Sequence, residues 1–210
     1  MLAKGSLSWI GGAIFFTLVA GYASMNLDGI LFILLGFLFF TGVILTIFFI
    51  IFFRDPQSIP QGDEDDAVSP ADGRVISTKD NTICIFMNIH NVHVNRAPLA
   101  GRVTHIDYKP GGYIPAFNKD SLVNERNHVV METGSGTLEL TQIAGVLTRR
   151  IVSYISEGSE LKRGERIGMI RFGSRVDVII PQGYEFTVGV NDTVKAAETI
   201  IATKKEKIRR

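Results

Sequence analysis

Two apolar runs without a single charged residue dominate the first quarter of the chain, Leu7–Met25 and Ile30–Phe53. Each is long enough to cross the roughly 30 Å hydrocarbon core of a bilayer as a helix. Only the turn-like tetrapeptide Asn26–Gly29 separates them, so the sequence predicts a two-helix membrane hairpin over residues 1–54. The alternative is a cleaved signal peptide followed by one span. It is disfavoured because the second run is too long for a signal core and no Ala-x-Ala site follows the first.

The charges that flank the two runs predict their orientation. Lys4 precedes the first run, Arg54 follows the second, and the connecting turn carries the acid Asp28 but no base. Basic residues near membrane spans favour the cytoplasmic side. We therefore expect a cell-membrane protein with two spans, both ends of which lie in the cytoplasm together with the rest of the chain.

The remaining residues have a different pattern. Residues 55–66 are polar, contain Pro56 and Pro60, and read as a linker. Residues 67–210 consist of short β-type segments broken by Gly, Pro, Asn and Asp, without a long helical periodicity. We therefore expect a mainly β domain of the β-sandwich or barrel-sandwich kind. The predicted strands are 74–78, 82–88, 101–108, 128–133, 137–143, 150–155, 165–171, 175–180 and 185–190.

Charge and cysteine content argue against some functions. The formal net charge is +1, so no overall positive field favours nucleic acid as a partner. The single cysteine, Cys84, cannot form an intramolecular disulfide, and it lies in an apolar segment. We expect it to be buried and unreactive.

A Gly-Ser pair, Gly173-Ser174, lies inside the β-rich region. Such pairs are common in turns, but this one has β-type segments on both sides and an aromatic residue, Phe172, before it. A serine hydroxyl is a poor nucleophile and needs an adjacent base before it can attack a carbonyl. A glycine at the preceding position has no side chain to obstruct that attack.

Two histidines, His90 and His93, follow a predicted strand in a His-x-x-His pattern. On a regular strand a spacing of three places them on opposite faces, so the chain must turn between them to bring them together. Asn91 would tolerate such a turn. They could instead be ordinary strand-end residues or a metal pair. Zinc needs three or four ligands, and the other histidines, His105 and His128, are not in a ligand motif.

A candidate acid, Asp72, lies in the turn sequence Ser69–Gly73, where aspartate usually bonds the local backbone. Together with the His-x-x-His and Gly-Ser motifs, this turn resembles the phosphatidylserine decarboxylase family in its short archaeal and bacterial form. The resemblance covers residues 67–190. Further matching residues are Pro98, Gly101, Pro110-Gly111, Asn124-Glu125-Arg126 and Gln142-Ile143-Ala144-Gly145. The sequence departs from the commonest Leu-Gly-Ser-Thr cleavage motif, because Phe172 and Arg175 flank its Gly-Ser pair.

The resemblance implies that the protein is a pyruvoyl-dependent decarboxylase. Self-cleavage between Gly173 and Ser174 would produce chains 1–173 and 174–210 and convert Ser174 into a covalent pyruvoyl group, with no metal. Asp72 would orient His93, the base for cleavage, and His90 would act in decarboxylation. The implied substrate is a serine-headgroup phospholipid, phosphatidylserine or archaetidylserine, and the products are the ethanolamine lipid and CO2. The partners are this lipid and the two chains of one precursor, and a homo-oligomer is left open.

Two other classes of protein compete with this interpretation. A membrane-anchored zinc peptidase would need a His-x-His and a distant His-x-x-x-Asp motif, and the sequence contains neither. A non-catalytic barrel-sandwich binding module on a membrane hairpin would leave Asp72, His90, His93 and Ser174 as unrelated polar residues. Only the decarboxylase interpretation predicts two chains on a denaturing gel without added protease.

Overall fold

The structure, a computed structural model of the chain, describes residues 1–111, 124–145, 151–172 and 174–205. The chain divides into two units, Met1–Pro56 and Gln57–Arg210. The first contains the helices α1 (Leu7–Ser24) and α2 (Gly29–Phe52). Both are long and apolar enough to cross a membrane, and the two-helix hairpin expected from the sequence is confirmed as part of the fold.

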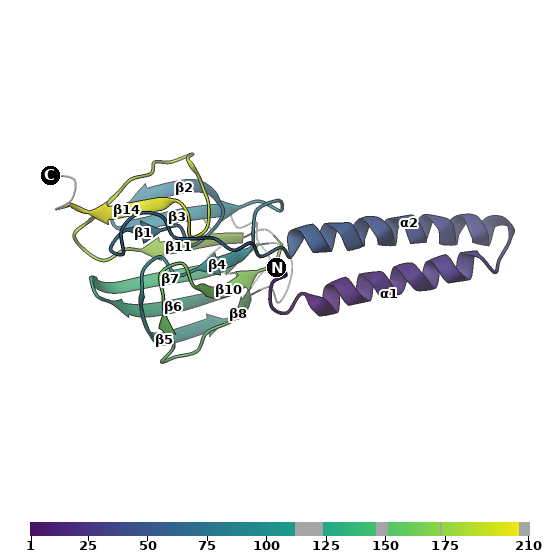
Figure 1. The fold of residues 1–210 in the computed structure, drawn as a ribbon, viewed down its shortest axis with the longest axis horizontal. Coiled ribbons are helices and arrows are strands. Elements are labelled where there is room, and N and C mark those ends of the chain that lie inside the picture. The colour runs from purple at the N-terminus through teal and green to yellow at the C-terminus, as the bar shows by residue number, and fades with distance from the viewer. Residues whose placement is uncertain (112–123, 146–150, 173, 206–210) are drawn as a thin grey trace. The chain divides into compact units, whose positions relative to one another are not determined.

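The two helices lie side by side (Figure 1). Their contact depends on small residues, because a Cβ atom at Gly42 would lie only 2.4 Å from the Thr17 hydroxyl oxygen. Such close helix contacts through small residues are typical of membrane bundles.

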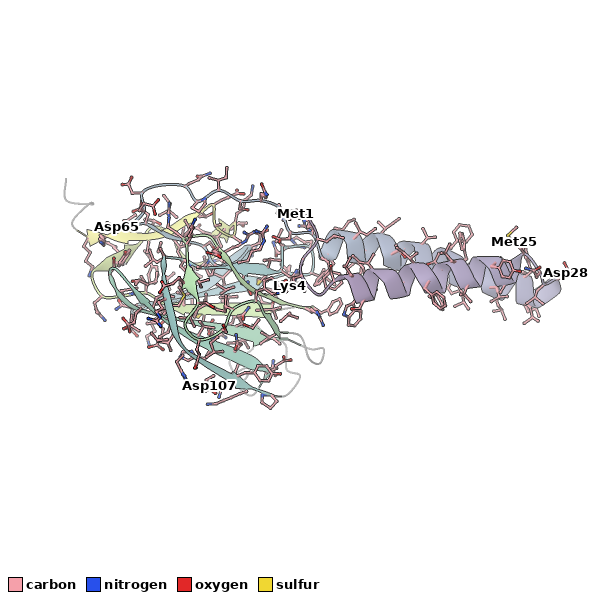
Figure 2. The ribbon with its side chains drawn as sticks, turned by 60° about the horizontal axis from the view of Figure 1, so that its bottom comes forward. Met1, Lys4, Met25, Asp28, Asp65 and Asp107 are labelled. Carbon is pink, nitrogen blue, oxygen red and sulfur yellow. The ribbon has the colours of Figure 1, made fainter. Side chains whose placement is uncertain are left out.

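Both ends of the hairpin lie together. The backbone N–H of Asp55 donates a hydrogen bond of 2.8 Å to the carbonyl of Met1. Figure 2 shows Met1 and Lys4 at one end of the helix pair and Met25 and Asp28 at the other. A membrane crossed by both helices would therefore have the two ends of the hairpin on one side.

The second unit is built from antiparallel strands, as the mainly β expectation required (Figure 1). Its largest sheet has the order β13-β2-β3-β11-β7-β6-β5-β9, and two smaller sheets have the orders β4-β10-β8 and β1-β14-β12. The strands are β1 (Ala67–Val68), β2 (Gly73–Lys79), β3 (Thr82–Met87), β4 (Val94–Arg96), β5 (Gly101–Lys109), β6 (Arg126–Thr133), β7 (Gly136–Ala144), β8 (Ile151–Ser153), β9 (Glu160–Leu161), β10 (Arg166–Ile170), β11 (Ser174–Ile179), β12 (Tyr184–Phe186), β13 (Thr193–Val194) and β14 (Ile200–Lys204).

All nine strands predicted from the sequence have counterparts, namely β2, β3, β5–β8 and β10–β12. The beginning of the predicted strand 150–155 lies outside the described residues. Five short strands were missed, β1, β4, β9, β13 and β14. Four of them are only two or three residues long, too short for an alternating pattern to be recognised.

Part of the predicted linker is bound to the β unit. The Arg163 guanidinium donates hydrogen bonds to the carbonyl oxygens of Gln61 (3.0 Å), Gly62 (3.3 Å) and Asp66 (2.9 Å). Residues 57–66 therefore belong to the second unit rather than extending freely between the two.

Strand β11 lies in the middle of the largest sheet, where it pairs with β3 on one side and β7 on the other along its whole length. Its side chains alternate between two environments. Ser174, Val176 and Val178 are buried and point to one face, whereas Arg175 and Asp177 are half-buried on the other. The first residue of this central strand is the predicted nucleophile.

Candidate active site

The Ser174 side chain is fully buried. The pairing of β11 places it opposite Met87, the last residue of β3, and Ala144, the last residue of β7. Its hydroxyl donates a hydrogen bond of 3.3 Å to the Met87 sulfur. Because a thioether is a weak acceptor, this hydroxyl is removed from water but only loosely held. Gly173, the other residue of the predicted cleavage site, lies outside the described residues.

Phe172, which directly precedes Gly173, has a positive φ of 59°. This left-handed conformation is unfavourable for a bulky side chain, at about 1–2 kcal/mol per residue. Backbone strain of this kind persists only where the surrounding structure imposes it, and it is concentrated at functional sites. The chain thus enters the Gly-Ser bond from a strained residue.

His93 is fully buried and lies directly before β4. Strand β4 pairs with β10, and the His93 carbonyl accepts a hydrogen bond of 3.2 Å from the N–H of Ile170. Since β3 also pairs with β11, residues 88–93 connect the strand beside β11 to the strand beside β10. The fold therefore brings the backbone of the predicted base to the segment that leads into Ser174.

His90 is in a different environment, because its side chain is exposed. The chain turns around it, since the N–H of Asn91 donates to the Asn88 carbonyl (3.0 Å) and the Asn88 N–H donates to the Asn91 side chain (2.8 Å). The two histidines are thus separated by a turn, one exposed to solvent and one within the protein. Their distinct roles in catalysis stay predictions.

Asp72 connects three segments of the fold. Its carboxylate accepts one hydrogen bond from the N–H of Val92 (3.2 Å) and another from the N–H of Ala196 (2.8 Å). Val92 is the neighbour of His93, so Asp72 fixes the backbone that carries this histidine. Ala196 belongs to the segment after the Gly-Ser bond. The orientation of the His93 ring by Asp72, implied by the resemblance, stays a prediction.

The Asn124-Glu125 motif holds the end of β7, whose last residue, Ala144, is paired with Ser174. The Asn124 side chain donates to the carbonyl of Ala144 (2.8 Å), and the Ala144 N–H donates to the backbone carbonyl of Glu125 (2.9 Å). Glu125 is itself buried, and its carboxylate accepts from the Tyr108 hydroxyl (3.1 Å). These bonds hold the end of β7 where it pairs with Ser174.

The opposite face of β11 carries a charge pair beside the only cysteine. The Arg175 guanidinium donates to the Asp177 carboxylate, with Nε 2.6 Å from Oδ1. Burial, reinforced by the neighbouring Asp177, raises the pKa of Cys84 to about 12. Cys84 is therefore a buried thiol that stays protonated at neutral pH.

Sequence reasoning missed Met87 and the strain at Phe172. In the sequence Met87 is one apolar residue of an apolar strand. Its contact with Ser174 follows only from the pairing of β3 with β11. The aromatic residue before Gly-Ser was noticed, but a left-handed conformation cannot be predicted for a phenylalanine, which rarely adopts it.

The chain is similar to known proteins over most of its length. The sequence model of the family described as Phosphatidylserine decarboxylase matches residues 45–202. A protein of Methanococcoides burtonii, provisionally named an archaetidylserine decarboxylase proenzyme, is 50% identical over 98% of this chain and 97% of its own length. One of the same name from Methanosarcina mazei is 47% identical over 98% of each chain.

A bacterial relative covers less of the chain. The phosphatidylserine decarboxylase proenzyme of Streptomyces coelicolor is 51% identical over 71% of this chain and 70% of its own length. The family match covers most of the chain, and the archaeal relatives align over nearly all of it. This chain therefore belongs to the phosphatidylserine decarboxylase family and is a decarboxylase.

Proposed function

We propose that the chain is a proenzyme that cleaves itself between Gly173 and Ser174 and then decarboxylates a serine-headgroup phospholipid with the pyruvoyl group made from Ser174. The observation that carries this proposal is the position of Ser174. Its hydroxyl is fully buried at the start of the central strand, just after the strained Phe172 and beside the segment that bears His93.

Self-cleavage begins when Ser174 Oγ attacks the carbonyl carbon of Gly173. The C–N bond breaks, His93 transfers the hydroxyl proton to the released amine, and an ester joins the two parts. Removal of the Ser174 α-proton then expels the Gly173 carboxylate and leaves dehydroalanine. One water molecule replaces the nitrogen, which departs as ammonia, and the new terminus carries a ketone. Cleavage also frees Phe172 from the constraint of a continuous chain.

The residues around Ser174 suit this product. When formed, the pyruvoyl group would supply a ketone that binds the substrate amine and an adjacent carbonyl that takes up the electron pair left as CO2 departs. His90 is exposed in the turn that follows β3, at the end of β3 that pairs with Ser174. It delivers a proton to the substrate α-carbon. Histidine suits this role because its ordinary pKa lies near neutrality.

We propose archaetidylserine as the natural substrate. The relatives that align over 98% of this chain are provisionally named archaetidylserine decarboxylase proenzymes, whereas the cited bacterial phosphatidylserine enzyme aligns over 71%. Both lipids present the same serine headgroup, on which the reaction takes place. The two are compared by supplying each in mixed vesicles to the purified protein and measuring CO2 and the ethanolamine lipid.

We expect intact-mass analysis of the purified protein to find two chains, residues 1–173 and a ketone-bearing chain from position 174 to 210. Size-exclusion chromatography without denaturant should elute them together. The small chain contributes β11, paired on both sides with strands of the large chain, and β14, paired with β1, so it cannot leave without unfolding the domain. An active preparation that consists of one uncut chain would contradict the proposal.

We also propose that α1 and α2 span the cell membrane with both ends in the cytoplasm, because Lys4 and Arg54 flank the hairpin. A membrane-impermeant maleimide should label Asn26→Cys from outside intact cells, and Lys4→Cys only after lysis. The unmodified protein is the control, since the raised pKa of buried Cys84, about 12, prevents its labelling at pH 7. Labelling of both variants from the same side would exclude a two-span hairpin.

A further inference from the structure

A row of three buried amides leads to the sulfur atom that Ser174 contacts. The Asn127 side chain donates to the Gln142 carbonyl oxygen at 3.0 Å, and Gln142 donates to Oδ1 of Asn95 at 2.8 Å. Nδ2 of Asn95 then lies 3.6 Å from the sulfur of Met87. None of these four side chains is more than 2% exposed. We call Asn127, Gln142 and Asn95 the amide row.

The amide row has a direction. Because Oδ1 of Asn95 accepts from Gln142, its NH2 group is the end that faces Met87. The same NH2 group lies 3.5 Å from the carbonyl of Pro70. The Met87 sulfur thus receives two hydrogen bonds, one from Asn95 and one from the Ser174 hydroxyl.

The neighbouring strand leaves room for this arrangement. A Cβ atom at Gly168 of β10 would lie 3.2 Å from Nε2 of Gln142 and 2.6 Å from the carbonyl oxygen of Val152. Glycine at this position keeps the space beside the Gln142 amide free.

Stability alone does not account for the amide row. A buried amide left without a partner costs about 1–3 kcal/mol, whereas replacing paired amides by apolar groups of the same shape can be nearly neutral. What the row does provide is position. Methionine has three flexible side-chain torsions and no preferred direction of its own. A donor fixed through Asn95 holds the sulfur in one place.

We infer that Met87 is a positioning residue for self-cleavage, and that the amide row holds its sulfur where it orients the Ser174 hydroxyl. The sulfur accepts the hydroxyl hydrogen, which leaves the oxygen lone pairs available for attack. Because a thioether binds that hydrogen weakly, the proton can still pass to a base. This inference rests on the proposed self-cleavage at Ser174.

The test compares the cleavage rate of newly synthesised full-length protein with its thermal stability. We expect Met87→Leu, which removes the sulfur but keeps a similar volume, to cut about tenfold more slowly or worse, since misplacement of a reacting group by about 1 Å costs up to 100-fold. The matched control is Met131→Leu. Met131 is equally buried, on β6, and its replacement should leave the rate unchanged.

A second variant separates positioning from packing. Met87→Gln restores an acceptor near the sulfur position but places an amide in an apolar core, so it should be less stable than Met87→Leu. We nevertheless expect it to cut faster than Met87→Leu. A purely structural role predicts the reverse order, in which the cleavage rate follows stability.

The amide row adds a coupling test. We expect Gln142→Met to slow cleavage in the wild-type background but to add less than twofold in the Met87→Leu background, because its effect passes through the sulfur. The inference about Met87 would be overturned if Met87→Leu cut at the wild-type rate, or if the cleavage rates of the Met87 variants followed their stabilities. Neither result would affect the proposed function. Wild-type protein that never cuts would overturn the proposed function instead.

Discussion

Ser174→Ala is expected to remain a single chain and to lose decarboxylase activity completely. The substitution removes the attacking oxygen and the atoms from which the ketone is made, so neither step has a substitute group. Denaturing electrophoresis and intact-mass analysis after prolonged incubation check the first expectation. Release of CO2 from a serine-headgroup lipid in mixed vesicles checks the second.

A matched control for this prediction is Ser77→Ala. Ser77 is a half-buried hydroxyl on β2, in the same sheet but removed from the Gly-Ser bond, and its loss should leave both cleavage and activity intact. Because Met87 is the one acceptor that the described residues give the Ser174 hydroxyl, the Ser174→Ala protein should melt close to the temperature of the uncut wild-type precursor. Cleavage at the same bond in the Ser174→Ala variant would exclude this serine as the nucleophile.

The second large effect separates the two histidines. His93→Ala is expected to slow self-cleavage by about 10²–10⁴-fold, the usual contribution of a general base. His90→Ala should cut normally and then decarboxylate about 100-fold or more slowly, because the role proposed for its exposed side chain is on the substrate and not on the precursor. The rate of chain cleavage and the rate of CO2 release from fully cut protein are measured separately.

Two additions make this comparison interpretable. His93 is fully buried, so His93→Gln, which fills more of its space than alanine, distinguishes loss of the base from a cavity. His105→Ala is the surface control. Its side chain is 63% exposed and pairs with Glu157, and its removal should affect neither rate. Normal cutting by His93→Ala together with failure of His90→Ala to cut would reverse the assignment.

Asp72 contacts the main chain on both sides of the proposed cleavage site in sequence. Its carboxylate holds the N–H of Val92 and that of Ala196, so it couples the backbone next to His93 to the segment that becomes the small chain. The family resemblance placed this acid beside the histidine ring. In the structure the Asp72 carboxylate instead holds the main chain next to His93, through the N–H of Val92. The turn sequence Ser69–Gly73 did not predict this contact.

The sequence by itself determined the two helices and most of the strands, because these elements depend on the residues within each segment. The two charge-free runs became α1 and α2 within one residue of the expected ends, because a helix satisfies all its backbone groups internally. The nine predicted strands followed from β-type segments between turn residues. The Gly-Ser pair and the histidines were grouped through the resemblance to the decarboxylase family, not through local periodicity.

Tertiary structure alone decided how these residues meet. Met87 and Ser174 are 87 positions apart, and only the antiparallel pairing of β3 with β11 puts the sulfur next to the hydroxyl. His93 is buried directly before β4, which pairs with β10, while His90, three residues earlier, remains exposed. Strand register depends on cross-strand packing over the whole sheet, and a periodicity measured along one segment contains no information about the segment that will lie beside it.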